Sequence, residues 1–187
     1  MVGEAFRPPA GGLPVAAILP VRKRNRLPLE NYRGGKACSL TISTCQRNAW
    51  FRDKPVAQHY IDALKKASER DSWQVYAYCF MPDHLHLLVG STNAADLIDF
   101  VKRFKQATGW WFRNRYLLAG SLKASPTSSL PPLWHKSFHD HILRSEEDLL
   151  HTARYILENP VRAGLVESPA DYPYAGSIVR GNELFAS

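Results

Sequence analysis

The apolar residues between positions 37 and 157 alternate between the spacing of a strand and the spacing of a helix. Short β-branched or alternating runs predict strands, and apolar residues three and four positions apart predict helices. The predicted strands span residues 37–44, 73–81, 84–89 and 135–143. The predicted helices span residues 55–70 and 96–116, and a third helix starts at Ser145 with a capping-box-like entry. Pro82 and Asp83 provide the turn of a hairpin between the second and third strands.

The order of these elements is β-α-β-β-α-β, followed by one more helix. This order is typical of the ferredoxin-like split βαβ arrangement, an antiparallel sheet with two helices on one face. We therefore expect an α+β fold whose other sheet face is free to carry a site. The fold alone defines no function, because acylphosphatases, RNA-binding modules and nucleases share it.

The 187 residues fit one domain with extensions. Residues 1–31 are rich in Pro, Gly and Arg and show no period, which predicts a mobile extension. We expect the catalytic domain to span residues 32–166 and a C-terminal tail to span residues 167–187. Residues 120–132 are rich in Ser, Pro and Leu and predict a loop.

The chain is basic, with 24 Lys and Arg against 17 Asp and Glu and a net charge of +7. Most of the excess lies in residues 1–36, whose only acids are Glu4 and Glu30. The basic residues there are Arg7, Arg22, Lys23, Arg24, Arg26, Arg33 and Lys36. A basic arm favours a polyanionic partner, usually nucleic acid, although a solvated tail that aids solubility has the same composition.

Several classes of protein are excluded by composition. No run approaches the roughly 18 apolar residues of a membrane helix, and the N-terminus lacks the continuous apolar core of a signal peptide. The cysteines Cys38, Cys45 and Cys79 are odd in number and lack metal-ligand spacing. They fit buried thiols in a reducing compartment. We therefore expect a cytoplasmic protein without a membrane partner, associated with the nucleoid if it binds DNA.

His84 and His86 form an HxH motif on the third predicted strand. Alternate side chains of a strand share a face, so both imidazoles point the same way, opposite to Leu85, Leu87 and Val89. Two imidazoles placed in this way can bind one divalent metal. An HxH motif is also common where two histidines merely occupy a half-exposed face.

Tyr155 lies off the apolar stripe of the last predicted helix. Leu149, Leu150, Ala153, Ile156 and Leu157 form that stripe at about 100° per residue. By the same arithmetic Tyr155 lies roughly 160° from the centre of the stripe. Asn159 follows one turn later on the polar side. The pair therefore points away from the packing face, which fits either a reactive tyrosine or an ordinary surface tyrosine.

Two histidines and a tyrosine together suggest phosphoryl transfer. A phenol is a poor nucleophile at neutral pH because its pKa is near 10. A divalent cation can polarise a bound phosphate. The phenol oxygen can then attack phosphorus, forming a phosphotyrosine and releasing a sugar hydroxyl. The phosphotyrosine bond retains the energy of the broken phosphodiester bond, so the DNA strand can be rejoined without a nucleotide cofactor.

Three segments in this order resemble the single-tyrosine HUH transposases, most closely the REP-associated branch of the IS200/IS605-like superfamily. The segments are YCFMPDHLHLLV at residues 78–89, WHKSFHDHILR at 134–144 and YILENPVRAGLV at 155–166. The resemblance covers about residues 30–175. It implies a metal-dependent single-stranded DNA endonuclease and strand transferase that acts on hairpin DNA through a 5′-phosphotyrosine.

The resemblance also implies roles for individual residues. His84 and His86 match the metal ligands and Tyr155 matches the nucleophile. Asn159 stands where insertion-sequence relatives carry a Gln that completes the metal site, and its side chain is one methylene shorter. The implied metal is Mg²⁺ or Mn²⁺. Because imidazole is a softer ligand than Mg²⁺ prefers, we expect Mn²⁺ to support activity better in vitro.

His139, Asp140 and His141 form a second HxH motif. Its central residue is charged, whereas the HUH pattern has an apolar residue there, so these residues are expected to support the site or contact DNA rather than to bind the metal. His59, His135 and His151 are expected at the surface or in hydrogen bonds, with His151 one turn before Tyr155.

The expected DNA contacts are basic residues from three places: the arm, the second helix and the segment after the last helix. They are Arg22, Lys23, Arg24, Arg26, Lys102, Arg103, Lys105, Arg113, Arg115 and Arg162. Trp110, Trp111 and Tyr116 accompany the helix residues and could stack on bases, although most are expected in the core.

Two other functions fit parts of this pattern. A non-catalytic hairpin-binding protein could share the fold without needing His84, His86 and Tyr155 together. An RNA-recognition module would have exposed aromatic residues on its central strands, where histidines stand here. The implied DNA carries an imperfect hairpin and a short flanking guide sequence. Relatives include swapped dimers and monomers, and we expect a monomer.

Overall fold

The computed structural model describes residues 36–91, 96–118, 132–143 and 145–179. One antiparallel sheet has the strand order β4-β1-β3-β2-β5. The strands are β1 (Cys38–Ser43), β2 (Trp73–Met81), β3 (His84–Ser91), β4 (His139–Ile142) and β5 (Ala175–Gly176). The helices are α1 (Lys54–Asp71), α2 (Leu97–Leu118), α3 (Glu146–Leu157) and α4 (Asn159–Arg162). The first four strands, α1 and α2 confirm the predicted split βαβ arrangement.

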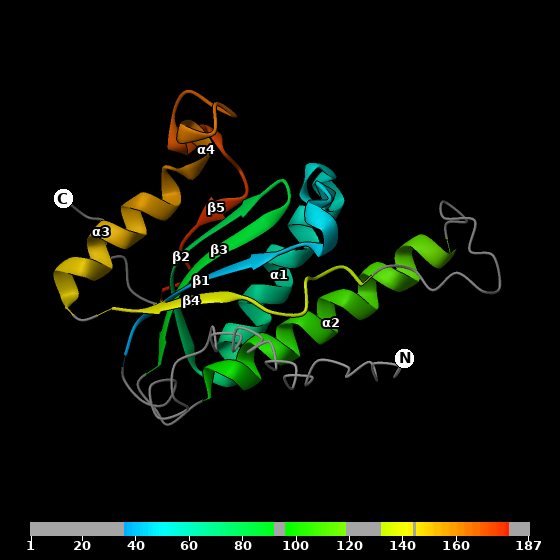
Figure 1. The fold of residues 1–187 in the computed structure, drawn as a ribbon, viewed down its shortest axis with the longest axis horizontal. Helices are drawn as coiled ribbons and strands as arrows, with labels where there is room; N and C mark the ends of the chain where they lie inside the picture. Colours follow the sequence, from blue (N-terminus) through cyan, green and yellow to red (C-terminus); the bar gives the residue numbers. More distant parts are fainter. Residues whose placement is uncertain (1–35, 92–95, 119–131, 144, 180–187) are drawn as a thin grey trace, which may run out of the picture.

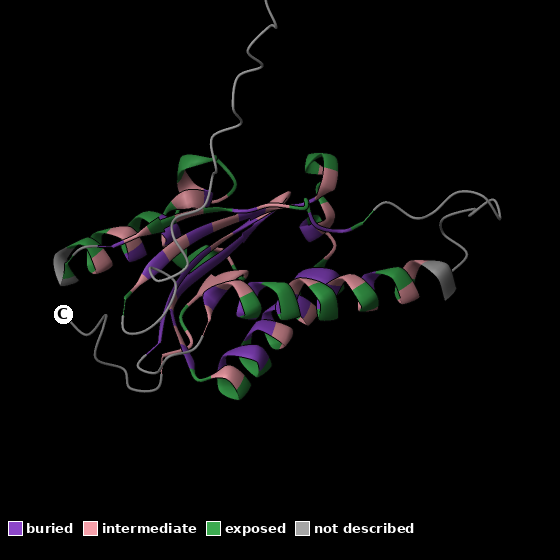
Figure 2. Cartoon of the chain, turned by 60° about the horizontal axis from the view of Figure 1, so that its bottom comes forward, coloured by how far each residue is buried: buried purple, intermediate pink, exposed green. Residues whose placement is uncertain are grey.

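Two hydrophobic cores lie on opposite faces of this sheet. The main core joins the sheet to α1 and α2 and includes Leu40, Tyr60 and Phe100. The second core, smaller, joins the sheet to α3 and includes Cys79, Ala153 and Ile156. Accordingly, α1 and α2 lie on one side of the sheet and α3 on the other (Figure 1). Most strand residues are buried, whereas the helices alternate between buried and exposed residues (Figure 2).

The alternation of β3 determines which side chains each face receives. Leu85, Leu87 and Val89 are fully buried in the main core, as the sequence predicts. His84, His86 and Leu88 therefore face the α3 side. The expectation that this face is free is only partly correct, because α3 packs on β2 and β3 there. What remains open is the part around the histidines, which are half-buried.

The last predicted strand, residues 135–143, is much shorter in the structure. Only His139–Ile142 form a continuous ladder with β1; before them, the His135 amide donates to the Ser43 carbonyl (2.9 Å) and Trp134 forms an isolated bridge with Thr44. The backbone before it finds other partners: the Nζ of Lys105 donates to the carbonyls of His135 (2.6 Å) and Lys136 (3.2 Å). The segment before β4 thus combines isolated backbone contacts with side-chain hydrogen bonds in place of a regular ladder.

The C-terminal part contains structure that the sequence pattern did not indicate. The expected tail, residues 167–187, includes β5, which pairs with β2. Tyr172 adds a hydrogen bond from its hydroxyl to the Phe80 carbonyl (2.7 Å). The expected loop at 120–132 and the arm at 1–31 lie outside the described residues, apart from Pro132. Among the described helices none is long and apolar enough to cross a membrane.

Candidate active site

The imidazoles of His84 and His86 face each other on β3. Their Nε2 atoms lie 3.0 Å apart, and the ring planes are nearly perpendicular, at 84°. Two nitrogens that each bind one ion at about 2.1 Å and at a right angle lie about 3.0 Å apart. The spacing therefore fits two neighbouring positions in the shell of a single metal ion.

The opposite nitrogen of each ring is held by a polar side chain. In the tautomer that leaves Nε2 unprotonated, Nδ1 of His84 donates to Asp83 Oδ1, and Nδ1 of His86 donates to Thr41 Oγ1 (3.1 Å). Such outer hydrogen bonds fix the tautomer and orientation of metal-binding histidines. Thr41 stands directly opposite His86 on β1, so the sheet register provides this contact.

The electrostatic environment of the two histidines favours the neutral imidazole at His86. Burial, together with the positive charges of His84, Arg162 and Arg47, lowers the pKa of His86 to about 4. Arg47 also lies 3.4 Å from Asp83 Oδ2. Burial acts to raise the pKa of Asp83, but its hydrogen bond to His84 and the charges of His84 and Arg47 outweigh burial, so this pKa is below its ordinary value. The site thus combines the Asp83 carboxylate with a neutral imidazole at His86, whose Nε2 atom faces that of His84.

Tyr155 is exposed at the end of α3, with 52% of its surface accessible, as its position off the apolar stripe predicts. Ala153 and Ile156 on the same helix are buried against the sheet. Leu150, expected on the apolar stripe, is instead 40% exposed. The phenol is therefore accessible to a macromolecule.

The guanidinium of Arg162 covers the ring of Tyr155, with its carbon 3.8 Å from the ring centre. Its Nη2 donates to the Tyr155 carbonyl (2.7 Å) and to Asn159 Oδ1 (2.9 Å). The charge of Arg162 also contributes to the low pKa of His86. α4 packs on β2, the strand next to β3, so Arg162 is near enough for its charge to act on His86 while its guanidinium covers Tyr155.

Asn159 is occupied by contacts within its own segment. Its Nδ2 donates to the carbonyls of Tyr155 and Ile156, both at 3.2 Å, and its Oδ1 accepts from Arg162. As a third metal ligand Asn159 would have to release Arg162, so this assignment stays a prediction. Among the described residues, no group of three or more His, Cys, Asp or Glu could hold a metal. The histidines would therefore need an amide, water or phosphate oxygen to complete a coordination shell.

Comparison with known proteins defines the family. Residues 37–159, more than half of the chain, match the family model described as "Transposase IS200 like". The chain belongs to the IS200-like transposase family.

Two curated relatives of this transposase family are similar to the chain. A putative REP-associated tyrosine transposase of Haemophilus influenzae is 28% identical over 137 residues, covering 66% of this chain and 72% of the relative. The REP-associated tyrosine transposase of Escherichia coli is 25% identical over 113 residues, covering 60% of this chain and 59% of the relative. The chain thus spans somewhat more than half of the length of the second relative.

A solved structure shares the fold. The REP-associated tyrosine transposase bound to a REP hairpin matches with a TM-score of 0.58 and 20% identity, covering 77% of this chain and 78% of the solved chain. At this identity the match supports the α+β fold. The resemblance inferred from the three sequence segments is confirmed by the family model and by the similar relatives.

The second HxH motif of the chain lies on the same sheet face as the first. His139 pairs with Thr41, which in turn pairs with His86. Two strand spacings, about 9.5 Å, separate His139 from His86, too far to share one ion. His139 and His141 are exposed, whereas Asp140 is paired with the core residue Leu40 and therefore faces the main core.

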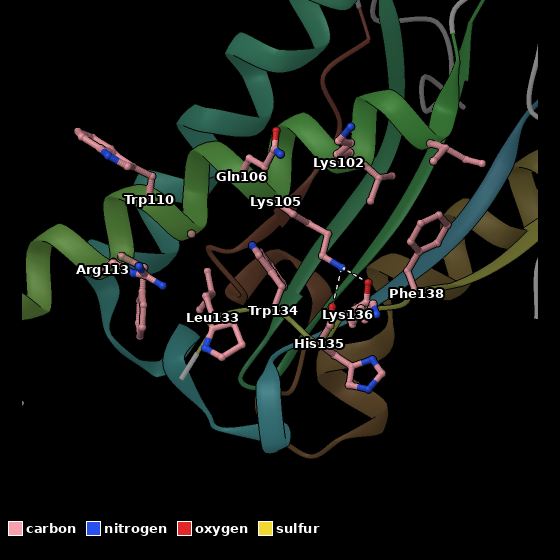
Figure 3. A pocket seen from close by; sticks show the side chains of 15 residues that line it. Lys102, Lys105, Gln106, Trp110, Arg113, Leu133, Trp134, His135, Lys136 and Phe138 are labelled. Carbon is pink, nitrogen blue, oxygen red and sulfur yellow. Dashed lines mark hydrogen bonds between the residues drawn. The ribbon is translucent and has the colours of Figure 1, made fainter. Parts of the chain in front are cut away.

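The basic residues predicted to bind DNA divide into distinct groups. Arg103 pairs with Asp71 (3.6 Å) and Arg115 with Asp53 (3.9 Å), both on the α1 side. Lys105 reaches from α2 to the segment before β4 (Figure 3). Lys102 and Arg113 are exposed on α2. Arg22, Lys23, Arg24 and Arg26 lie outside the described residues.

The remaining predicted aromatic and histidine residues have varied surroundings. Trp111 stacks on His59 with ring centres 3.8 Å apart, and burial lowers the pKa of His59. Tyr116 donates to Asp53 (3.2 Å). Trp110, expected mostly in the core, is 69% exposed. His135 and His151 are exposed, as predicted.

Sequence reasoning missed three residues that support the histidines: Thr41, Arg47 and Asp83. The position of Asp83 immediately before His84 was a usable signal, because a carboxylate next to a metal-binding histidine often orients it. Thr41 could be found only from the register of β1 with β3. Arg47 has a left-handed backbone (φ 56°) after β1, and nothing in its sequence neighbourhood predicts its contact with Asp83.

Proposed function

We propose that this chain is a metal-dependent single-stranded DNA endonuclease and strand transferase that acts on hairpin DNA through a 5′-phosphotyrosine at Tyr155. One observation carries the proposal: two histidines with facing Nε2 atoms lie on the sheet face against which the helix bearing an exposed tyrosine packs. The similarity to REP-associated tyrosine transposases, one of them solved with a REP hairpin, supports hairpin DNA as the substrate class.

His84 and His86 would hold a Mg²⁺ or Mn²⁺ ion through Nε2, with Asp83 and Thr41 orienting the two rings. The bound ion would polarise the scissile phosphate and stabilise the charge that develops on it. The lowered pKa of His86 keeps its imidazole neutral over the whole physiological range, which leaves the lone pair on Nε2 available.

Tyr155 is the proposed nucleophile. Its Oη forms a bond to phosphorus while the bond from phosphorus to the 3′ oxygen breaks, so the 5′ phosphate stays on the protein and the released strand ends in a 3′ hydroxyl. The phenol proton leaves as the bond to phosphorus forms, and the departing 3′ oxygen gains a proton. Attack by another 3′ hydroxyl on the phosphotyrosine rejoins DNA and frees Tyr155.

Arg162 is the proposed link between the nucleophile and the phosphate. It covers the ring of Tyr155, and three of its donors are directed at Tyr155, Glu158 and Asn159. An arginine can exchange such contacts for a bidentate contact with phosphate. That exchange would release Asn159 Oδ1, the group that the family resemblance assigns to the metal.

The proposal is tested with a 5′- or 3′-labelled hairpin oligonucleotide, full-length protein and Mn²⁺. We expect a labelled protein band on a denaturing gel with the 3′-labelled DNA, because the tyrosine keeps the 5′ phosphate of the downstream strand. The Tyr155→Phe variant should form no such band. A chain that binds the hairpin and forms no covalent band with any metal would instead be a non-catalytic hairpin-binding protein.

A further inference from the structure

A groove of about 560 Å³ lies between α2 and the segment before β4. This volume is within the range of about 300–1,000 Å³ typical of small-molecule sites. Its wall includes the apolar side chains of Leu133, Trp134 and Phe138, and its rim carries the basic side chains of Lys102, Arg113 and Lys136. α2, one wall of the groove, lies on the side of the sheet opposite to α3 (Figure 1), and His84 and His86 are on the α3 side.

The wall of the groove is fixed by Lys105. Its Nζ donates to the carbonyls of His135 and Lys136, which ties the segment before β4 to α2 (Figure 3). Trp134 anchors the same segment by donating from its indole nitrogen to Thr108 Oγ1 on α2 (2.8 Å). These hydrogen bonds fix the position of the segment before β4 relative to α2, so the two walls of the groove are pre-formed.

Gly109 and Trp110 line the groove from α2. Trp110 is 69% exposed, and its indole extends outward from α2 at one end of the groove, away from Leu133 and Trp134 (Figure 3). A Cβ placed on Gly109 would meet nothing within 4 Å, so packing does not require a glycine there. Glycine is unfavourable within a helix. Its missing side chain leaves space beside Trp110 in the wall of the groove.

The charge at the groove is entirely positive. None of the described residues that line it is acidic, and Lys102, Arg113 and Lys136 form no ion pair with a described residue. Lys102 and Arg113 are eleven positions apart, which places them on one face of α2 about 16 Å from each other. Cations at this separation can contact different phosphates of one strand.

We propose that this groove binds unpaired nucleotides of single-stranded DNA, with a base stacked on Trp110 and the flanking phosphates at Lys102, Arg113 and Lys136. An apolar wall, an exposed indole at one end and a rim that carries three basic and no acidic residues among the described ones suit a ligand that combines flat apolar faces with negative charge. The proposal deepens the proposed function, on which it rests for the class of ligand. It gives the chain a second DNA-binding surface, separated from the tyrosine by the sheet.

The test measures the affinity of full-length protein for a labelled oligo-dT and for heparin, in EDTA so that binding is read without cleavage. Heparin is the control ligand because it is a polyanion without bases. We expect Trp110→Ala and Gly109→Leu each to weaken oligo-dT binding about 5- to 100-fold, the range for loss of one stacked base. Trp110→Ala should leave heparin binding unchanged. Gly109→Leu should melt no lower than the wild type, because Leu favours helix.

Lys102→Ala combined with Lys136→Ala should weaken binding of both ligands. The matched control, Lys65→Ala with Lys66→Ala, removes the same charge from exposed positions on α1 and should leave both affinities close to those of the wild type. Equal losses for heparin and oligo-dT in Trp110→Ala would show a general polyanion surface and overturn the base site. The base site would also be overturned if Trp110→Ala and Gly109→Leu bound oligo-dT as tightly as the wild type does. Failure of the wild type to bind oligo-dT at low salt would overturn it as well.

The covalent-band assay separates this proposal from the proposed function. If the wild type forms the Tyr155 adduct and the groove variants bind oligo-dT normally, the groove is not a DNA site, and the proposed function stands. If the wild type forms no adduct and the groove variants lose oligo-dT binding, the groove is a DNA site on a chain that does not cleave.

Discussion

The Nε2 atoms of His84 and His86 lie 3.0 Å apart, each on a ring whose other nitrogen is held by a polar side chain. When one Nε2 carries a proton, this contact is a hydrogen bond between the rings; when neither does, both lone pairs are directed at one point, where a cation can bind them. The proposed reaction depends on the facing Nε2 atoms of the two histidines. Metal binding and cleavage at this site can be measured separately from DNA binding.

Removal of the metal site should abolish cleavage and spare binding. We expect EDTA, or His84→Ala with His86→Ala, to eliminate the covalent band, while hairpin affinity changes little because it depends mainly on phosphate contacts. Mn²⁺ binding followed by electron paramagnetic resonance provides the direct readout. Asn159→Ala in the same titration shows whether the amide is a ligand. Cleavage that persists in EDTA would contradict the metal assignment.

Loss of the hydrogen bond at Thr41 should weaken the metal site without removing a ligand. Thr41→Val keeps the side-chain shape and deletes the partner of His86 Nδ1. We expect the affinity for Mn²⁺ to fall about 10- to 100-fold, the usual effect of losing such a partner, and the stability to fall by about 1 kcal/mol. Ser39→Ala, on the same strand and sheet face, is the control. Equal Mn²⁺ affinity in both variants would rule out an orienting role.

Arg162 should matter for the chemical step more than for stability. Its side chain is 38% exposed, so Arg162→Ala should leave the melting temperature nearly unchanged. We expect single-turnover adduct formation to slow about 10²- to 10³-fold, the usual effect of removing a group that stabilises transition-state charge. Arg162→Lys should restore little, because an ammonium lacks the planar group that covers Tyr155. The control is Arg154→Ala, because Arg154 is exposed on α3 next to Tyr155. A rate for Arg162→Ala equal to that of this control would refute the role.

The basic arm should contribute to affinity through charge. Deleting residues 1–31 removes Arg7, Arg22, Lys23, Arg24 and Arg26. Affinity for single-stranded DNA should decrease, and the slope of log affinity against log salt should become shallower by about 0.7 for each lost phosphate contact. An unchanged slope would mean that the arm serves only solubility.

Elements with a clear period could be predicted from the sequence. The hairpin of β2 and β3 was located correctly because alternating apolar residues flank Pro82 and Asp83, and the exposure of Tyr155 followed from its angle to the apolar stripe. The two-residue β5 and the four-residue α4 are too short to show a period. Their positions depend on tertiary contacts such as the hydrogen bond from Tyr172 to Phe80.

Details of the site depended on contacts between distant segments. Thr41 is 45 positions from His86, and only the register of two strands brings them together. Trp110 and Trp111 are neighbours in sequence, yet one is exposed and the other stacks on His59, because adjacent helix residues point about 100° apart. No sequence pattern assigns such a pair to core or surface without knowing where α1 packs.

The central claim, that Tyr155 is the nucleophile, is tested most directly by Tyr155→Phe. This change keeps the ring and removes the attacking oxygen, and the exposed hydroxyl has no hydrogen bond with a described residue, so stability and hairpin affinity should change little. The matched controls are Tyr116→Phe, Tyr172→Phe and Tyr174→Phe, which should still form the covalent band. The decisive measurement is the covalent protein–DNA band formed with a labelled hairpin and Mn²⁺. The proposal predicts that the band and nicking disappear together in Tyr155→Phe alone; a band that persists in Tyr155→Phe and disappears in one of the other variants would show that the nucleophile is a different tyrosine.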